Sequence, residues 1–290
     1  MQYSAPETIE SALKLLESDD DARVMAGGTD LIVQMTSGMR SPSHVVDIKR
    51  IPELCGVVQT ADGGWKIGAA VPGAELNEHV ELKRDWPGFV EATDLIGSMQ
   101  VQGRATPVGN LCNASPAGDA VPGMVAAGAT VTVAGSNGFR DVAAHDVPAA
   151  PGRTNLEKNE FVIAVNLPPK PPNSGDAYLR FIPRTEMDIA VVGTGVFLAF
   201  GESGHVREAR IALGAIAPTV VFCTEAADAL IGSRLEEEAI EAAVLAARNA
   251  CNPIDDKRGT AEFRVHTVGV LIKRSIAIAT QRAKRQVGMD

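Results

Sequence analysis

Clustered metal ligands are the first feature that the sequence lacks. Its 290 residues include only four cysteines (Cys55, Cys112, Cys223 and Cys251), and none of them belongs to a Cys-x-x-Cys pair. The five histidines are likewise scattered singly along the chain. Because zinc sites and iron–sulfur clusters need closely spaced ligands, we expect no metal site held by this chain alone, and free core thiols at the cysteines.

Signatures of several enzyme classes are also missing. The chain has no G-x-S-x-G elbow, no H-E-x-x-H motif and no Gly-Lys dipeptide. These absences exclude the usual serine hydrolases, zinc proteases and P-loop nucleotide-binding proteins. Gly193 and Gly195 form a G-x-G pair without the third glycine of a dinucleotide-binding fingerprint, so strand packing is the better interpretation of them.

Positive charge is scarce as well. The chain has 27 Lys and Arg residues against 36 Asp and Glu residues, a net charge of −9. A phosphate backbone is bound by a basic face, so nucleic acid is not expected as a main partner.

The longest stretch without a charge or a strong turn signal, Ile189 to Phe200, is too short to cross a bilayer. No secretory signal is visible, and we expect a cytoplasmic protein without a membrane span.

The composition that is present is typical of a globular protein long enough for two domains, with 45% hydrophobic and 22% charged residues. Its first fifty or so residues predict a small βαβ unit. An amphipathic helix is indicated by the apolar stripe at Ile9, Ala12, Leu13 and Leu16. There follow a strand over 23–26, a pair of glycines, a helix from Leu31 and a second strand over 44–48.

The rest of the chain is divided by turn signals. We expect strands over 65–71, 129–134 and 161–167, and a helical region over 74–95. The proline-rich run Pro168 to Gly175 is the best linker candidate and sets a domain boundary. Beyond it we expect three antiparallel strands and two helices, over 177–182, 189–200, 206–216, about 235–250 and 260–284. The basic face of the last helix (Lys273, Arg274, Arg282, Lys284, Arg285) is either a solvated side or a docking surface for an acidic partner.

Two segments are suited to bind a ligand. The first is Met25-Ala26-Gly27-Gly28-Thr29-Asp30-Leu31-Ile32, where glycines and the N–H groups that open a helix can approach a phosphate. Taken by itself, this segment is more simply a tight turn from strand to helix. The second runs from Thr106 to Asp119, with small residues, two side-chain amides and a final acid that can accept hydrogen bonds from a sugar hydroxyl.

Together these segments resemble the FAD-binding (medium) subunit of the molybdenum hydroxylases, the family of carbon monoxide dehydrogenase and xanthine dehydrogenase. The pattern is A-G-G-T-D-L followed by T-x-x-G-N-L-x-x-A-S-P-x-x-D. Arg184 to Val192 resembles the start of that family's C-terminal domain, and Pro253 to Arg274 resembles its closing helix. The resemblance implies an α+β fold with an FAD-binding domain over 1–172, made of a small βαβ lobe (about 1–55) and a larger mixed α/β lobe (about 56–172). A C-terminal domain over 176–290, with a three-stranded antiparallel sheet and helices, would follow.

The resemblance also implies which residues hold a non-covalently bound FAD. Backbone amides of the first motif would wrap the pyrophosphate and the second motif would face it, while Asp119 would hold ribityl or ribose hydroxyls. Apolar residues would pack against the flavin, and Arg180 would lie near the cofactor. The full set is Met25, Ala26, Gly27, Gly28, Thr29, Asp30, Leu31, Ile32, Ile96, Thr106, Pro107, Val108, Gly109, Asn110, Asp119, Val162, Ile163 and Arg180. In one departure, Pro107 and Val108 replace the family's usual Ile-Gly, which puts a Cβ where the backbone normally approaches phosphate.

Electron transfer is the activity that the resemblance implies. In this family a large subunit carries the molybdenum cofactor and a small subunit carries two [2Fe–2S] clusters. The flavin of this chain would collect electrons from the clusters and pass them to an external acceptor, within a dimer of heterotrimers. We then expect no catalytic nucleophile or general base here, because the cofactor supplies the chemistry. Two alternatives are a stand-alone flavin-dependent oxidoreductase, similar to the cell-wall enolpyruvyl reductases, and a scaffold subunit that has lost its flavin.

Overall fold

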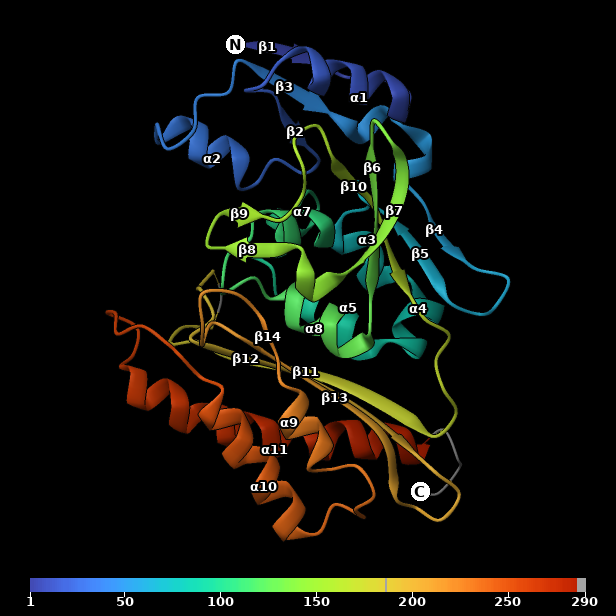
Figure 1. Cartoon of the computed structure of the whole chain (residues 1–290), viewed down its shortest axis with the longest axis vertical. Coiled ribbons are helices and arrows are strands. Elements are labelled where there is room, and N and C mark those ends of the chain that lie inside the picture. The colour runs from blue at the N-terminus through green and yellow to red at the C-terminus, as the bar shows by residue number, and fades with distance from the viewer. Residues whose placement is uncertain (186, 286–290) are drawn as a thin grey trace.

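The protein is arranged as three stacked parts (Figure 1). The structure, a computed structural model, describes residues 1–185 and 187–285. Glu186, in the segment that resembles the start of the C-terminal domain, and residues 286–290, at the end of that predicted domain, lie outside the described residues. In the view of Figure 1 a small lobe lies at the top, a larger lobe in the middle and the C-terminal domain at the bottom.

The first lobe is a three-stranded parallel sheet with strand order β1-β3-β2 and two helices. The predicted βαβ unit is confirmed, and the structure adds β1, whose three residues are too few to show a pattern. Thr8 caps the first helix, because its hydroxyl accepts the N–H of Ser11. The elements are β1 (Gln2–Ser4), α1 (Ile9–Ser18), β2 (Arg23–Met25), α2 (Leu31–Thr36) and β3 (His44–Asp47).

The second lobe contains a five-stranded antiparallel sheet of order β4-β5-β10-β6-β7. Its strands are β4 (Val57–Gln59), β5 (Trp65–Gly68), β6 (Thr130–Gly135), β7 (Gly138–Ala143) and β10 (Phe161–Leu167). The predicted helical region over 74–95 is split, and Pro87 starts its last helix at the N1 position. The helices are α3 (Gly73–Glu78), α4 (Val80–Asp85), α5 (Pro87–Asp94), α6 (Met99–Gln102), α7 (Pro107–Cys112) and α8 (Ala120–Ala127), and β8 (Pro148–Ala150) and β9 (Arg153–Thr154) form a small hairpin.

In its described residues, the C-terminal domain is an antiparallel sheet of order β11-β12-β13-β14 with three helices. The predicted three strands are confirmed as β11 (Ser174–Phe181), β12 (Val192–Phe200) and β13 (Val206–Gly214). The structure adds β14 (Val221–Phe222), which is too short to show an alternating pattern. The helices are α9 (Thr224–Asp228), α10 (Glu237–Asn249) and α11 (Ala261–Arg285), and Thr260 caps the last of them at Phe263.

Both faces of the C-terminal sheet are covered. On β12, Phe197 and Ala199 join the core of the N-terminal lobes, while Val196 and Leu198 pack in the core under the C-terminal helices. In Figure 1 this sheet lies between α5 and α8 on one side and α9 to α11 on the other. Gly195 serves this packing, because a Cβ there would lie 2.3 Å from the Pro122 carbonyl oxygen of α8. Strand packing is therefore the confirmed role of that glycine.

Candidate functional site

A cavity of about 490 Å³ lies between the first two lobes. It is lined by most of the residues of the first motif, by much of the second motif, and by Ile96 and Val162. The structure thus brings together two segments that are far apart in the sequence. Among the predicted residues, Ile32, Pro107, Asp119, Ile163 and Arg180 do not line it.

The first motif forms a tight turn between β2 and α2. Gly27 is required by the approach of the second lobe, because a Cβ there would lie 1.9 Å from the carbonyl oxygen of Arg104. Gly28 has φ +76°, a backbone conformation that L side chains rarely adopt. Asp30 precedes α2 without a side-chain hydrogen bond to the helix. In residues 1–185 and 187–285, the N–H groups of Thr29, Asp30 and Leu31 donate to no hydrogen bond of the protein, so they remain available to an anionic ligand.

The second motif forms α7 on the opposite side of the cavity. Pro107 stands at the first helical position and has no N–H, while the Thr106 hydroxyl accepts the Gly109 N–H at 2.9 Å. Val108 is buried and lines the cavity. Asn110 accepts the N–H of Ala120 at 3.1 Å, so its amide orders the start of α8. This side of the cavity therefore offers fewer free backbone donors than the first motif does.

A third wall comes from the segment 152–162, most of which was not predicted. Gly152 to Phe161 supplies much of the lining from one continuous stretch that includes β9. The sequence signal at this stretch is a run rich in charged residues from Arg153 to Glu160, and such a run is ordinarily a solvated loop. Cys112 also lines the cavity, and burial raises the pKa of its thiol to about 12, so this thiol stays protonated near pH 7.

Polar contacts join the two lobes at the cavity, among them a hydrogen bond from the Arg104 guanidinium to the Gly27 carbonyl at 3.5 Å. The Gln34 amide donates to Asn113 at 2.9 Å, and the Arg40 guanidinium donates to the Gly152 carbonyl at 3.0 Å. Lys158 forms an ion pair with Asp20 at 2.5 Å. Asp20, Arg40 and Lys158 are themselves lining residues, so these contacts lie at the cavity.

Asp119, Tyr178 and Arg180 form a buried cluster beside the cavity. The Asp119 carboxylate accepts the Tyr178 hydroxyl at 2.8 Å and the Arg180 guanidinium at 2.6 Å. Arg180 also donates to the Leu95 carbonyl at 2.8 Å. Burial raises the pKa of Asp119 to about 6, although Arg180 and Tyr178 act in the opposite direction. That Asp119 and Arg180 contact a cofactor stays a prediction, and Tyr178 is a member of this cluster that sequence reasoning missed.

The arrangement suits a ligand that is partly apolar and partly anionic. Leu31, Ile96, Val108 and Val162 supply apolar surface, and the free N–H groups of the first motif supply donors. Within the described ranges, no group of three or more His, Cys, Asp or Glu side chains is placed to hold a metal ion. None of the described helices has the length and apolar character needed to cross a membrane.

Comparisons with known proteins cover nearly the whole chain. A family model described as "FAD binding domain in molybdopterin dehydrogenase" matches residues 1–170, and one described as "CO dehydrogenase flavoprotein C-terminal domain" matches residues 177–279. The carbon monoxide dehydrogenase medium chain of Hydrogenophaga pseudoflava is 32% identical over 283 residues, which is 97% of each chain. The xanthine dehydrogenase FAD-binding subunit of Escherichia coli O157:H7 is 29% identical over 282 residues, 97% of this chain and 96% of that one.

Solved structures agree with these matches. A structure of carbon monoxide dehydrogenase from Hydrogenophaga pseudoflava that lacks the Mo-pyranopterin moiety of its cofactor superimposes with a TM-score of 0.93 and 32% identity. The match covers 97% of this chain and 98% of that chain. Quinoline 2-oxidoreductase from Pseudomonas putida 86 gives a TM-score of 0.89 with 27% identity over 98% of both chains.

Proposed function

Since the chain belongs to the family of FAD-binding subunits of molybdenum hydroxylases, we propose that it binds FAD between its first two lobes and serves as the electron exit of a multi-subunit dehydrogenase. The observation that carries the proposal is the cavity itself, because both motifs of the resemblance line it from opposite lobes. The free N–H groups of Thr29 to Leu31 fit the pyrophosphate.

Each wall of the cavity has its own part in holding FAD. Residues 25–32 present backbone amides to the pyrophosphate, and residues 106–110 face it from α7. Ile96 and Val162 would pack against the flavin, and Ile163 follows Val162 on β10. Asp119 holds hydroxyls of the ribityl or ribose group, and Arg180 lies near the cofactor. The side chains thus bind and orient, and none of them acts as a nucleophile or a general base.

The chemistry belongs to the cofactors. Bound FAD would accept electrons from the [2Fe–2S] clusters of a small partner subunit and deliver them to an external acceptor, while a large partner subunit carries the molybdenum cofactor. The relatives are named as medium chains and FAD-binding subunits of carbon monoxide and xanthine dehydrogenases, which supports such partners for this chain. Assembly as a dimer of heterotrimers in the cytoplasm, and the division into domains 1–172 and 176–290, are further parts of this proposal.

The decisive experiment is an absorption spectrum of the purified native complex before and after acid precipitation, with iron and molybdenum analysis of the same sample. We expect flavin absorption bands, FAD released by the acid, and iron and molybdenum that co-purify with the partner chains. Flavin without metals or partners would favour a stand-alone flavoenzyme instead. A colourless complex that takes up no FAD would support the alternative of a scaffold subunit that has lost its flavin.

The variant Gly27→Ala tests the place of the site. Its Cβ would meet the Arg104 backbone at 1.9 Å, so the two lobes must separate and FAD content should fall at least severalfold. Gly56→Ala is the matched control, because a Cβ there meets no atom within 4 Å. Equal FAD content in the two variants would contradict the placement between the lobes.

A further inference from the structure

Strand β11 of the C-terminal domain lies along helix α5 of the second lobe and contacts it with one face. Asp176, Tyr178 and Arg180 alternate along this strand, so their side chains leave it on the same side. All three are bonded to the N-terminal lobes, through Phe89, Asp119 and Leu95. The strand therefore joins the two domains through a row of polar groups.

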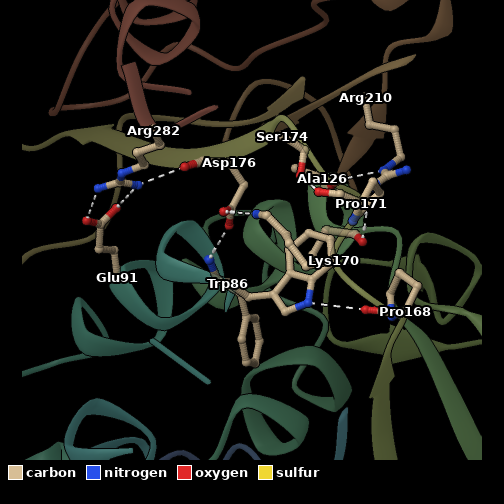
Figure 2. Close-up of polar contacts among 12 residues, drawn as sticks. Trp86, Glu91, Ala126, Pro168, Lys170, Pro171, Ser174, Asp176, Arg210 and Arg282 are labelled. Carbon is tan, nitrogen blue, oxygen red and sulfur yellow. Dashed lines mark hydrogen bonds and ion pairs between the residues drawn. The ribbon is translucent and has the colours of Figure 1, made fainter. Parts of the chain in front are cut away.

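At the start of α5, Asp176 acts as a helix cap supplied from another domain. Its Oδ2 accepts the N–H of Phe89 at 3.2 Å, and α5 has no side-chain cap of its own. Its Oδ1 binds Lys170 at 2.7 Å, and Lys170 in turn lies 4.1 Å from the centre of the Trp86 ring. Figure 2 shows this ammonium group between the ring and the carboxylate. The negative charge is thus fixed at the positive end of the helix.

At the other end of α5, Arg180 binds the carbonyl that the helix leaves open. Leu95 is the C-cap residue, and its oxygen accepts the guanidinium at 2.8 Å. A positive charge at this end again matches the helix dipole. The next residue, Ile96, lines the cavity. Arg180 therefore binds the residue directly before one that lines the proposed flavin site.

We propose that Arg180 is a positioning residue, which holds the end of α5 and with it Ile96 in place, so that the docked C-terminal domain shapes the wall of the flavin site. Arg180 does not line the cavity, and its guanidinium is bound to Asp119 and Leu95. Its influence on a bound flavin can therefore pass through Leu95 and Ile96 or through Asp119, which the proposed function places on the cofactor, and variants in an Asp119→Asn background separate the two routes. This inference rests on the proposed binding of FAD in the cavity.

Arg282 offers the matched control, because it is also an arginine of the C-terminal domain that holds α5. It binds Glu91 in the middle of the helix and the Asp176 carbonyl at 2.8 Å (Figure 2). Glu91 precedes Ile96 by five residues in the chain. Arg180→Met and Arg282→Met both remove a guanidinium from the same helix. Only Arg180→Met removes the hydrogen bond to Leu95, the residue that precedes Ile96.

The experiment compares these variants in the purified holoenzyme by flavin absorption spectrum, flavin midpoint potential and rate of FAD release. Arg180→Met should shift the flavin bands and the potential and speed FAD release about tenfold or more, the effect of losing a hydrogen bond to a charged group. Arg282→Met should keep the spectrum and potential of the unmodified protein. Arg180→Lys should restore part of the difference, because an ammonium group can still donate to Leu95.

A second variant covers the case in which Arg180→Met leaves too costly a charge on Asp119 for the chain to fold. Asp119→Asn combined with Arg180→Met removes both charges, and it should show the same spectral shift relative to Asp119→Asn alone. Unchanged flavin properties in these variants, or an equal shift in Arg282→Met, would overturn the positioning role. An unmodified holoenzyme without FAD would instead refute the proposed function.

Discussion

The interface between the first two lobes and the joint between the second lobe and the C-terminal domain are built in opposite ways. Across the cavity, the ion pair of Lys158 with Asp20 has side chains that are 59% and 75% exposed. At the joint, the ion pair of Lys170 with Asp176 has side chains that are 9% and 3% exposed. This ion pair at the cavity is one that water can replace, whereas the charges at the joint are buried and paired with each other.

This difference fits the two tasks. If FAD binds in the cavity as proposed, it has to enter between the lobes, and weak contacts at the edge of the cavity would allow the lobes to open. The joint must keep one geometry, and buried charges with specific partners hold it, because any displacement leaves a charge unpaired. Arg210 adds to the joint, because it stacks 3.9 Å from the centre of the Phe197 ring and donates to carbonyls at the end of α8.

The largest expected effect is a loss of stability when a charge at the joint is removed. Lys170→Met leaves the Asp176 carboxylate buried without its cation, so the free energy of unfolding should fall by about 3–5 kcal/mol. Lys273→Met removes an exposed ion pair with Glu241 and should cost about 0–1 kcal/mol. Urea unfolding of both variants measures the difference.

A double variant checks the cause of that loss. Lys170→Met with Asp176→Asn removes both charges, and the new amide oxygen can still accept the Phe89 N–H. It should recover most of the lost stability. If the double variant is as unstable as Lys170→Met, the stability was lost because Lys170 no longer packs against Trp86, and not because a charge was left unpaired.

The pH dependence of the joint is the next largest effect. Burial raises the pKa of Asp119 from its ordinary 3.8 to about 6. Between these values the folded chain binds a proton that the unfolded chain has lost, so this group's contribution to stability falls as pH rises. The free energy of unfolding of the unmodified protein, relative to Asp119→Asn, should therefore drop by about 2 kcal/mol between pH 4 and pH 6.

Urea titrations of both proteins at several pH values measure this drop. The comparison with Asp119→Asn cancels the carboxylates that the two proteins share. A constant difference across the range would mean that Asp119 keeps its ordinary pKa, and that the joint tolerates its charge without cost.

The contrast between the two interfaces was only partly predictable from sequence. Glycines followed by a helix start marked one wall of the cavity, because local backbone geometry demands those residues. The segment 152–161 gave no such sign, since a charged run looks the same in a loop and in a cavity wall. Arg282 belongs to the basic face suggested for docking, yet it binds Glu91 of the same chain. Pairings between residues this far apart arise only when the domains pack.

The smallest expected effect concerns stability at the cavity, where Lys158→Met removes the exposed pair with Asp20. The free energy of unfolding should change by less than about 1 kcal/mol. Release of FAD should nevertheless become faster, because this contact holds the wall 152–162 against the first lobe. Dissociation of FAD followed by flavin fluorescence, beside urea unfolding, separates the two quantities. A large loss of stability with unchanged release would mean that the lobes are held as rigidly as the joint, and the proposed opening of the cavity would be wrong.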